Sequence, residues 1–366
     1  MKLAIYGAQG YALSTYEAIK TLYPKREILC FLVTKMGKNA SVLSGLPVKE
    51  LAFFSSQLSD DERSGVEIII ATPENVQAEI KEGLNACGFY NCVRMTSKRW
   101  EELMKIYHAR LGVFLPIEGL AVGSTKPSVR IFVARSHNDK PINMDAFCVT
   151  EGRDHMITIQ VGAALTDGKL CELTDDLGDN ISHKNANYCE LTGLYWIWKN
   201  ALEGRDHTEN NPEYFGLAQY RRRFEFSDDD LYRLADNDVD VVLPYPLMYD
   251  PDINAHHERY IKTADWEALL SVLGTLYPEY AAVLPEFLEQ RYLYNYNVLL
   301  AKKSVLNDYC DWLFTLLEAI EKTSVPRGCE RSDRYLGYMA EILETLYFMK
   351  NADVLNIVHK GCRMYV

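Results

Sequence analysis

Hydrophobic and polar residues alternate with two different periods in the first third of the chain. Short apolar runs stand at residues 3–6, 28–33, 66–71 and 92–95, and stretches with helical spacing lie between them, at 13–22, 73–86 and 98–108. Strands that alternate with helices are typical of a parallel sheet with right-handed crossovers. The pattern therefore predicts an α/β domain over residues 1–125.

A segment rich in glycine and proline follows, from about residue 112 to 128. Such a composition favours a domain boundary, which we place near residue 125. Beyond it, the β-branched run 129–134 predicts a strand, and the polar residues 135–140 come at the end where α/β folds place ligand loops. Residues 157–161 predict a further strand. We therefore expect residues 126–366 to form a second α/β domain.

The stretch from residue 182 onward has the spacing of one long helix. Its apolar residues step by three and four and predict a single buried stripe: Tyr188, Leu191, Tyr195, Trp198 and Leu202. Four side chains with polar groups share the flank beside that stripe: Asn185, Thr192, Trp196 and Lys199. In one interpretation this flank lines a polar ligand cleft. In the other, the helix belongs to the core, its aromatic residues pack, and Lys199 is solvated near the helix end.

Two glycines, Gly7 and Gly10, stand between the first predicted strand and its helix. A glycine turn at this place lets backbone N–H groups meet a phosphate, so both are candidate cofactor-binding residues. The alternative is that they serve only a tight turn. The second strand ends in Val33-Thr34-Lys35, without the acidic residue that binds an adenosine ribose, which disfavours NAD.

Composition narrows the choice of function. The chain has 366 residues, enough for two domains, and a formal net charge of −12, which argues against broad nucleic-acid binding. Nine cysteines occur without zinc spacing, and neither a signal peptide nor a spanning segment is recognisable. We expect a cytoplasmic protein, and contact with the inner face of the cell membrane stays open.

Four ordered sequence boxes carry a family resemblance. They read NISHKNANYCELTGLYWIWKN (180–200), YFGLAQYRRRF (214–224), YNYNVLLAKKSVLNDYCDWLF (294–314) and RYLGYMAEILETLYF (334–348). Together they resemble a family of bacterial capsule and exopolysaccharide glycosyltransferases, long described only as a domain of unknown function. The resemblance covers about residues 128–366 and implies a GT-A-like fold. Gln219 and Arg223 depart from the family spelling, where a histidine and a tyrosine are usual.

The resemblance also implies a substrate and a site. The donor is expected to be a nucleoside-diphosphate sugar, with UDP-galactopyranose or UDP-galactofuranose favoured, and the acceptor a polysaccharide or a lipid-linked glycan. The expected substrate-binding residues are Asn180, Lys184, Asn185, Trp196, Lys199, Tyr220, Arg221, Arg222, Asn295, Asn297 and Arg334. Glu341 is the expected catalytic base, because transfer with inversion needs a group that takes the acceptor proton.

The sequence leaves metal dependence open but does not favour it. Asp238-Val-Asp240 has the spelling of a metal-binding Asp-x-Asp pair, yet it precedes an apolar run, so a turn that begins a strand is the better interpretation. Arg221 and Arg222 can neutralise a departing diphosphate in place of a cation. A solvated basic edge is the alternative for these arginines. The adjacent His256 and His257 lack a third ligand at zinc spacing.

The layout of residues 1–125 resembles the Rossmann-like N-terminal domain of sugar acyltransferases, which holds a nucleotide-sugar. The hexapeptide repeat those enzymes need for acyl transfer is absent. Two other functions stay open: a non-catalytic nucleotide-sugar-binding scaffold for capsule assembly, and a nucleotide-sugar oxidoreductase that uses the first domain.

Overall fold

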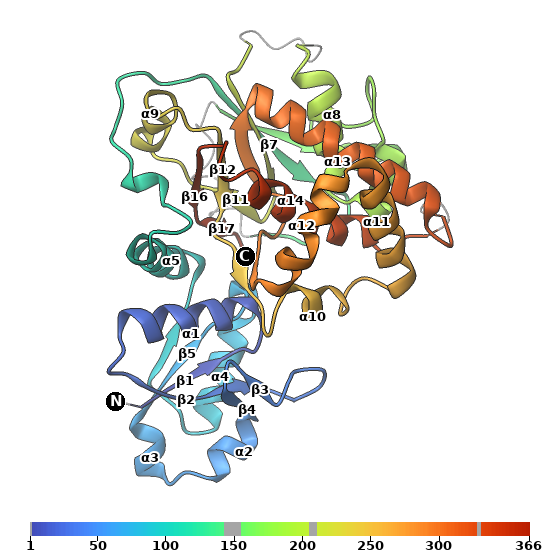
Figure 1. Ribbon diagram of the computed structural model, residues 1–366. Coiled ribbons are helices and arrows are strands. Elements are labelled where there is room, and N and C mark those ends of the chain that lie inside the picture. Colours follow the sequence, from blue (N-terminus) through green and yellow to red (C-terminus); the bar gives the residue numbers. More distant parts are fainter. Residues whose placement is uncertain (1, 143–154, 205–210, 328–330) are drawn as a thin grey trace.

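The computed structural model describes residues 2–142, 155–204, 211–327 and 331–366. Two α/β units follow one another along the chain, and each is built on its own sheet. Figure 1 shows the smaller N-terminal unit at one end of the molecule, with helix α5 (Ser97–Leu111) between its sheet and the larger C-terminal unit. None of the helices in the described ranges is both long and apolar enough to cross a bilayer.

The N-terminal sheet has the strand order β3-β4-β2-β1-β5-β6, parallel throughout except for β3. Its strands are β1 (Lys2–Tyr6), β2 (Glu27–Val33), β3 (Val42–Leu43), β4 (Leu46–Glu50), β5 (Val66–Ile70) and β6 (Cys92–Arg94). The accompanying helices are α1 (Gly10–Leu22), α2 (Leu51–Ser56), α3 (Asp60–Ser64), η1 (Glu74–Val76) and α4 (Gln77–Ala86). Strands β1, β2 and β5 carry almost uninterrupted apolar residues, because helices cover both faces of a parallel sheet.

The C-terminal sheet has the main order β16-β12-β15-β10-β7-β8-β9, and along this path β15 is antiparallel to both of its neighbours while the other pairs are parallel. Its strands are β7 (Val129–Arg135), β8 (Met156–Gln160), β9 (Leu173–Thr174), β10 (Tyr214–Gln219), β12 (Val241–Pro244), β15 (Leu299–Lys302) and β16 (Ile357–Lys360). A side branch leaves β10, where β11 (Arg222–Phe224) pairs with β10 and with β17 (Cys362–Met364). A separate pair is made by β13 (Leu247–Met248) and β14 (Tyr292–Leu293).

Helices pack on this sheet and bury the largest apolar cluster of the molecule. The helices that contribute to this cluster are α10 (Ile253–His257), α11 (Thr263–Leu276), α12 (Pro278–Glu289), α13 (Lys303–Thr323) and α14 (Tyr335–Lys350), while α9 (Asp228–Asp236) packs into a second cluster. Shorter helices are η2 (Ile117–Gly119), η4 (Ala163–Leu165), η5 (Ser182–Lys184), α7 (Asn185–Tyr188), α8 (Leu191–Trp196) and the π-helical η6 (Ile197–Ala201). Helices α13 and α14 run side by side, and α14 is buried along nearly its whole length.

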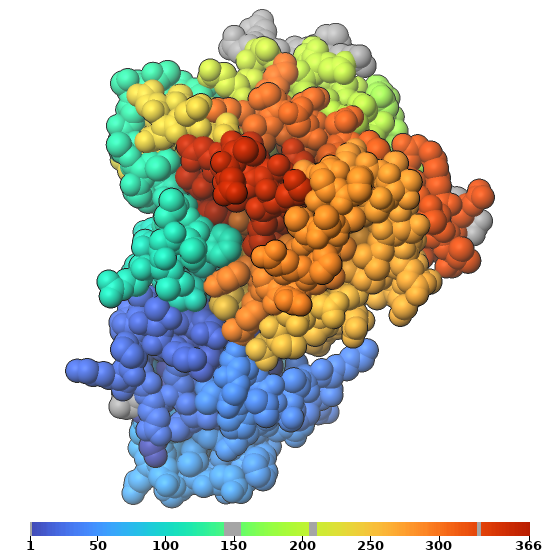
Figure 2. Space-filling model, in the orientation of Figure 1, coloured from blue at the N-terminus to red at the C-terminus, as the bar shows by residue number. Residues whose placement is uncertain are grey.

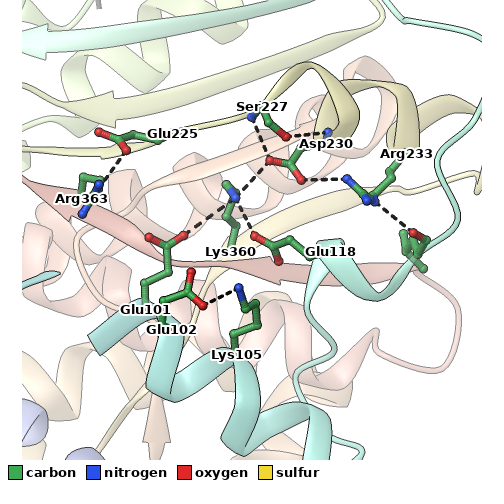
Figure 3. Close-up of polar contacts among 11 residues, drawn as sticks. Glu101, Glu102, Lys105, Glu118, Glu225, Ser227, Asp230, Arg233, Lys360 and Arg363 are labelled. Carbon is green, nitrogen blue, oxygen red and sulfur yellow. Dashed lines mark hydrogen bonds and ion pairs between the residues drawn. The ribbon is translucent and has the colours of Figure 1, made fainter. Parts of the chain in front are cut away.

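The two units share an apolar cluster at their junction, formed by Ala18, Trp100, Met104, Tyr107, Tyr245 and Leu247. Figure 2 shows the α5 region and the linker bridging the two units on one side. A charged network lies beside this cluster. The Lys360 ammonium is buried between Glu118 (2.7 Å) and Asp230 (3.1 Å), with Glu101 of α5 at 3.8 Å (Figure 3). The boundary near residue 125 therefore crosses a continuous packed interface.

The stretch from residue 182 is not one helix, contrary to the sequence prediction. A 3₁₀ turn and the short α7 end at Cys189, whose φ of 53° interrupts the helix before α8 and η6 begin. The α-helical period does not continue across this break. Asn185, Thr192, Trp196 and Lys199 therefore do not form one continuous polar flank.

Candidate functional site

The topology of the C-terminal sheet marks one place for a ligand. From β7 the chain moves outward to β8 and β9 on one side, and it then returns to β10 on the other side of β7. Ligands of open α/β sheets bind at the carboxyl ends of the strands where the order reverses. The carboxyl ends of β7 and β10 lead into residues 136–140 and 220–222.

A cleft of about 560 Å³ opens at this point. Its lining combines the loop after β7, the turn around Cys189, the end of β10 and the start of α14. The lining residues are Ala134, Ser136, Asn138, Asp139, Lys140, Val161, Asn185, Ala186, Cys189, Glu190, Gln219, Tyr220, Arg221, Arg222, Ser332 and Arg334. Of the predicted substrate-binding residues, the cleft brings together Asn185, Tyr220, Arg221, Arg222 and Arg334.

The arginine box forms a tight hairpin. Gln219 at the end of β10 pairs with Arg222 at the start of β11, so Tyr220 and Arg221 occupy the turn. The Tyr220 hydroxyl accepts a hydrogen bond from the Lys140 backbone N–H (3.2 Å), which joins the turn to the loop after β7. The turn thus presents Arg221 at the cleft, a placement that a single uninterrupted strand would not give.

Arg222 is held from below by an aromatic ring. Its guanidinium carbon lies 3.8 Å from the centre of the Tyr296 ring, a cation–π contact. Gln219 donates from Nε2 to the Tyr296 carbonyl oxygen (2.8 Å) and accepts at Oε1 from Arg222 (3.5 Å). The glutamine that replaces the usual histidine therefore links the hairpin to the segment that carries Tyr296.

That segment, residues 294–297, delivers donors to two carboxylates. Asn295 Nδ2 and the Tyr296 backbone N–H donate to the two oxygens of Glu341, at 3.1 and 2.9 Å. Asn297 Nδ2 donates to Glu190 Oε1 (2.8 Å). Tyr296 and Asn297 have φ values of 81° and 50°, a left-handed conformation that directs successive groups toward the two acids.

Glu341 is a partly buried acid whose pKa is raised. Removal from water, together with the nearby Glu190 charge, raises its pKa to about 7, against the opposing effect of the donors from Tyr296 and Asn295 and of Arg222. Glu341 is not part of the cleft lining, but it is close enough to Glu190 and Arg222, which do line the cleft, for their charges to affect its pKa. A carboxylate with a pKa near neutrality can take a proton and release it, as a general base must.

Arg334 and Cys189 line the cleft together and are in contact with each other. Arg334 has a φ of 63° at the start of α14, and its Nε donates to Cys189 Sγ (3.1 Å). Burial raises the pKa of the Cys189 thiol to about 12, with a smaller contribution from Glu190. This shift favours the neutral thiol, whose sulfur accepts the hydrogen bond from Arg334 beside the cleft.

Sequence reasoning missed two acids that line the cleft, Glu190 and Asp139. Asp139 accepts from the Ser136 backbone N–H (3.0 Å), and burial raises its pKa. The polar tail after the first predicted strand was the signal for Asp139. Glu190 carried no such signal, because its exposure depends on the break at Cys189.

Six predicted binding residues lie outside the cleft lining, and so does Glu341. Two of the six, Asn295 and Asn297, donate to Glu341 and Glu190 as described above. Asn180 donates to the carbonyl oxygens of Asp176 and Gly178, and Lys184 pairs with Glu321 (2.6 Å). Trp196 is buried and donates to the Leu177 carbonyl (2.9 Å), while the Lys199 ammonium lies 3.3 Å from the Trp198 ring centre. The expectation that one helical flank would line the cleft is corrected on this point, because the helix is broken.

The two aspartates of the Asp-x-Asp sequence, Asp238 and Asp240, form ion pairs with Lys302. Lys302 Nζ contacts Asp238 and lies 2.8 Å from Asp240, and Asp240 also accepts from the Asn356 backbone N–H. Within the described ranges, no group of three or more His, Cys, Asp or Glu residues is arranged to hold a metal ion. His256 instead lies 3.7 Å from the Tyr249 ring centre.

Packing alone explains why glycine stands at positions 7 and 10. A Cβ on Gly7, whose φ is 129°, would lie 2.6 Å from the Ala71 carbonyl oxygen. A Cβ on Gly10 would lie 3.0 Å from Leu247 Cβ, because β13 of the C-terminal unit covers the start of α1. Their role in holding a cofactor stays a prediction.

The sheet order and the charged cleft at its switch point define an α/β protein with one candidate site in the C-terminal unit. Residues 146–352 match the family model described as "Domain of unknown function (DUF4422)". This match covers more than half of the chain, and the protein belongs to this family.

One solved structure gives a measure of the fold. The chain is similar to the apo structure of the bifunctional glycosyltransferase WbbM, with a TM-score of 0.53 and 24% identity, over 65% of this chain and 45% of that one. The likeness confirms the predicted α/β class and its GT-A-like character. The matched part spans less than half of that protein's length. No curated protein matches the chain.

Proposed function

We propose that the protein is a glycosyltransferase that moves a sugar from a nucleoside diphosphate to a glycan or lipid-linked acceptor. The observation that supports it most is the cleft at the switch point, which is lined by guanidinium groups and has beside it the Glu341 carboxylate, whose pKa is near neutrality. The likeness to a bifunctional glycosyltransferase agrees with this reading, since both share the fold.

The arginine hairpin is assigned to the donor diphosphate. Arg221 sits in the turn at the cleft, Arg222 is fixed over Tyr296, and Arg334 faces them from the start of α14. Guanidinium groups bind phosphate oxygens through paired, charge-assisted hydrogen bonds, and they stabilise the negative charge that develops on the leaving diphosphate. This arrangement needs no divalent cation, and we assign none.

Glu341 is assigned as the base. As the acceptor hydroxyl oxygen forms its bond to the anomeric carbon, the bond from that carbon to the diphosphate oxygen breaks and the electron pair leaves with the diphosphate. The acceptor proton passes to the Glu341 carboxylate. Asn295 and Tyr296 hold that carboxylate in place during the transfer.

UDP-galactopyranose and UDP-galactofuranose are the proposed donors and a growing capsule or exopolysaccharide chain the proposed acceptor, following the sequence resemblance. The site of action proposed is the cytoplasm, with the acceptor reached at the inner face of the membrane.

A panel of nucleotide-sugars tests the proposal by thermal shift. A ligand at 100 times its dissociation constant adds about 2.7 kcal/mol to the stability of the folded protein. We expect UDP and a UDP-hexose to raise the melting temperature and NAD to leave it unchanged. Slow donor hydrolysis by the purified protein separates an enzyme from a non-catalytic scaffold, which would bind without turnover. Stabilisation by NAD alone would favour the oxidoreductase instead.

A further inference from the structure

The N-terminal unit contacts the segment 294–297, which donates hydrogen bonds to Glu341 and Glu190. Tyr11 of α1 packs edge-on against Trp100 of α5, with ring centres 5.2 Å apart. Its hydroxyl interacts with that of Tyr296 and contributes to the raised pKa of the Tyr296 phenol, for which burial is the larger cause. Tyr296 therefore lies between Tyr11 of the N-terminal unit and the Arg222 guanidinium of the cleft.

A small cavity of about 20 Å³ lies behind this contact, lined by Tyr11, Trp100, Pro244, Tyr245, Leu247, Asn295, Tyr296 and Cys362. Two buried donors at this cavity, Trp100 Nε1 and the Tyr245 hydroxyl, find no partner among the described residues. A volume of this size with polar walls can hold one water molecule. Asn295, which holds Glu341, forms part of the same wall.

A second set of contacts reaches the arginine strand from the other side. Strand β11, which begins with Arg222, is paired with β17, and the Tyr365 backbone N–H donates to the Arg221 carbonyl (2.9 Å). Just before β17, a Cβ on Gly361 would lie 2.4 Å from the Glu101 side chain of α5. Glu101 also faces the neighbouring Lys360 (Figure 3). Helix α5 thus packs directly on the strand that supports the arginines.

We propose that the N-terminal unit completes the transferase site, and that Tyr11 is a positioning residue which holds Tyr296 between itself and Arg222. Tyr296 and Asn297 have left-handed backbone conformations, which cost free energy and persist only where their surroundings hold them. Tyr11, which contacts the Tyr296 side chain, and Gln219, which donates to the Tyr296 carbonyl oxygen, are such surroundings. This positioning role does not require a ligand in the N-terminal unit.

Hydrogen exchange of the full chain tests this without any assumption about activity. Tyr11→Leu removes the aromatic contact and the hydroxyl, and we expect amides of residues 294–297 to exchange at least about 10-fold faster. Tyr11→Phe keeps the ring and should give an intermediate effect. Tyr23→Ala is the matched control, since this half-exposed tyrosine lies at the far end of the same helix. Unchanged exchange at 294–297 in a folded Tyr11→Leu protein overturns the proposal.

The kinetic arm rests on the proposed function. With a donor that the wild-type protein turns over, Tyr11→Leu should lower kcat on the order of 10- to 100-fold and leave the donor KM within about 3-fold. The base loses its support, whereas Arg221 stays in the turn and Arg222 stays fixed by its pairing with Gln219 and Met364. The acid limb of the pH profile should shift to lower pH, since water reaches Glu341. An equal fall in Tyr23→Ala contradicts a positioning role. A wild-type protein without turnover but with the exchange change would refute the transferase and retain the coupling.

Discussion

The two sheets of the molecule present the same topological feature, but they leave different room at it: a pocket of about 90 Å³ beside Gln9 and Gly10, and a cleft of about 560 Å³ at the ends of β7 and β10. In the N-terminal sheet the order reverses between β1 and β5, and in the C-terminal sheet between β7 and β10. At the first reversal, the Ala71 carbonyl lies against Gly7, and Leu247 from the other unit covers Gly10. At the second, a cleft of about 560 Å³ remains, lined by arginines and acids.

The difference shows that a switch point is a place for a ligand only where the following residues leave room and supply charge. After β1 the chain offers Ala8 and Gln9, with no cation of its own. After β10 it offers Tyr220, Arg221 and Arg222. Function is therefore argued from the side chains at the edge and not from the sheet order.

The largest effect on the C-terminal site is expected from Glu341→Gln, because this substitution removes the basic carboxylate and keeps the shape of the side chain. We expect turnover to fall on the order of 100-fold or more, with donor affinity nearly unchanged. In the wild-type protein kcat should fall as the pH drops below about 7, where the carboxylate takes up a proton and is lost as a base. A Gln variant within a few-fold of wild type would assign the base elsewhere, and Glu190→Gln is the next variant to measure.

The next largest effect is expected from substitution of the arginines in the hairpin. Alanine at Arg221 or Arg222 should weaken UDP binding by roughly 10- to 100-fold, which corresponds to the loss of one charge-assisted contact. Isothermal titration with UDP measures this directly. Arg363→Ala is a control on the neighbouring strand, because this arginine pairs with Glu225. Unchanged affinity in both arginine variants would remove the diphosphate from the hairpin.

A substitution at the switch point of the N-terminal sheet should lower the stability of the fold and leave the affinity for the donor unchanged. Gly7→Ala places a Cβ against the Ala71 carbonyl in a strained conformation, and should cost about 1–3 kcal/mol of stability. A thermal melt records the loss, and UDP affinity measured well below the melting temperature should match wild type. Reduced UDP affinity in this variant would mean that the N-terminal edge also holds the nucleotide.

Chelation should have the smallest effect. We expect transfer to survive EDTA, since Lys302 occupies Asp238 and Asp240 and the arginines supply the positive charge. Activity before and after dialysis against EDTA is the measurement. A complete loss that Mn²⁺ restores would contradict the assignment of the diphosphate charge to arginine alone.

The sequence predicted what depends on local periodicity. The N-terminal strands at β1, β2, β5 and β6 and the helices α1, α4 and α5 lie where the alternation of patterns placed them. Strands β3 and β4 went unpredicted, because β3 has only two residues and β4 contains Pro47 and ends in two charged residues. The first strand of the C-terminal sheet and its polar tail were also identified, and that tail lines the cleft.

The cleft itself was only partly predictable, because two single residues decide its walls. Cys189 adopts a positive φ and ends α7, which removes Trp196 and Lys199 from the cleft and brings in Glu190. Helical spacing gave no warning of this break. The role of Gln219 likewise depends on a contact with Tyr296, which is distant in the sequence, and no local pattern reports such a contact.

The pairing of β11 with β17 has a consequence for how the protein is made. Arg222 lies opposite Met364 in that ladder, so the two halves of the pair leave the ribosome far apart in time. Contacts between residues so distant in sequence form late, because loop closure must precede them. Until residue 364 has emerged, the strand with the arginines has an open edge, which a nascent chain must keep from pairing with other strands.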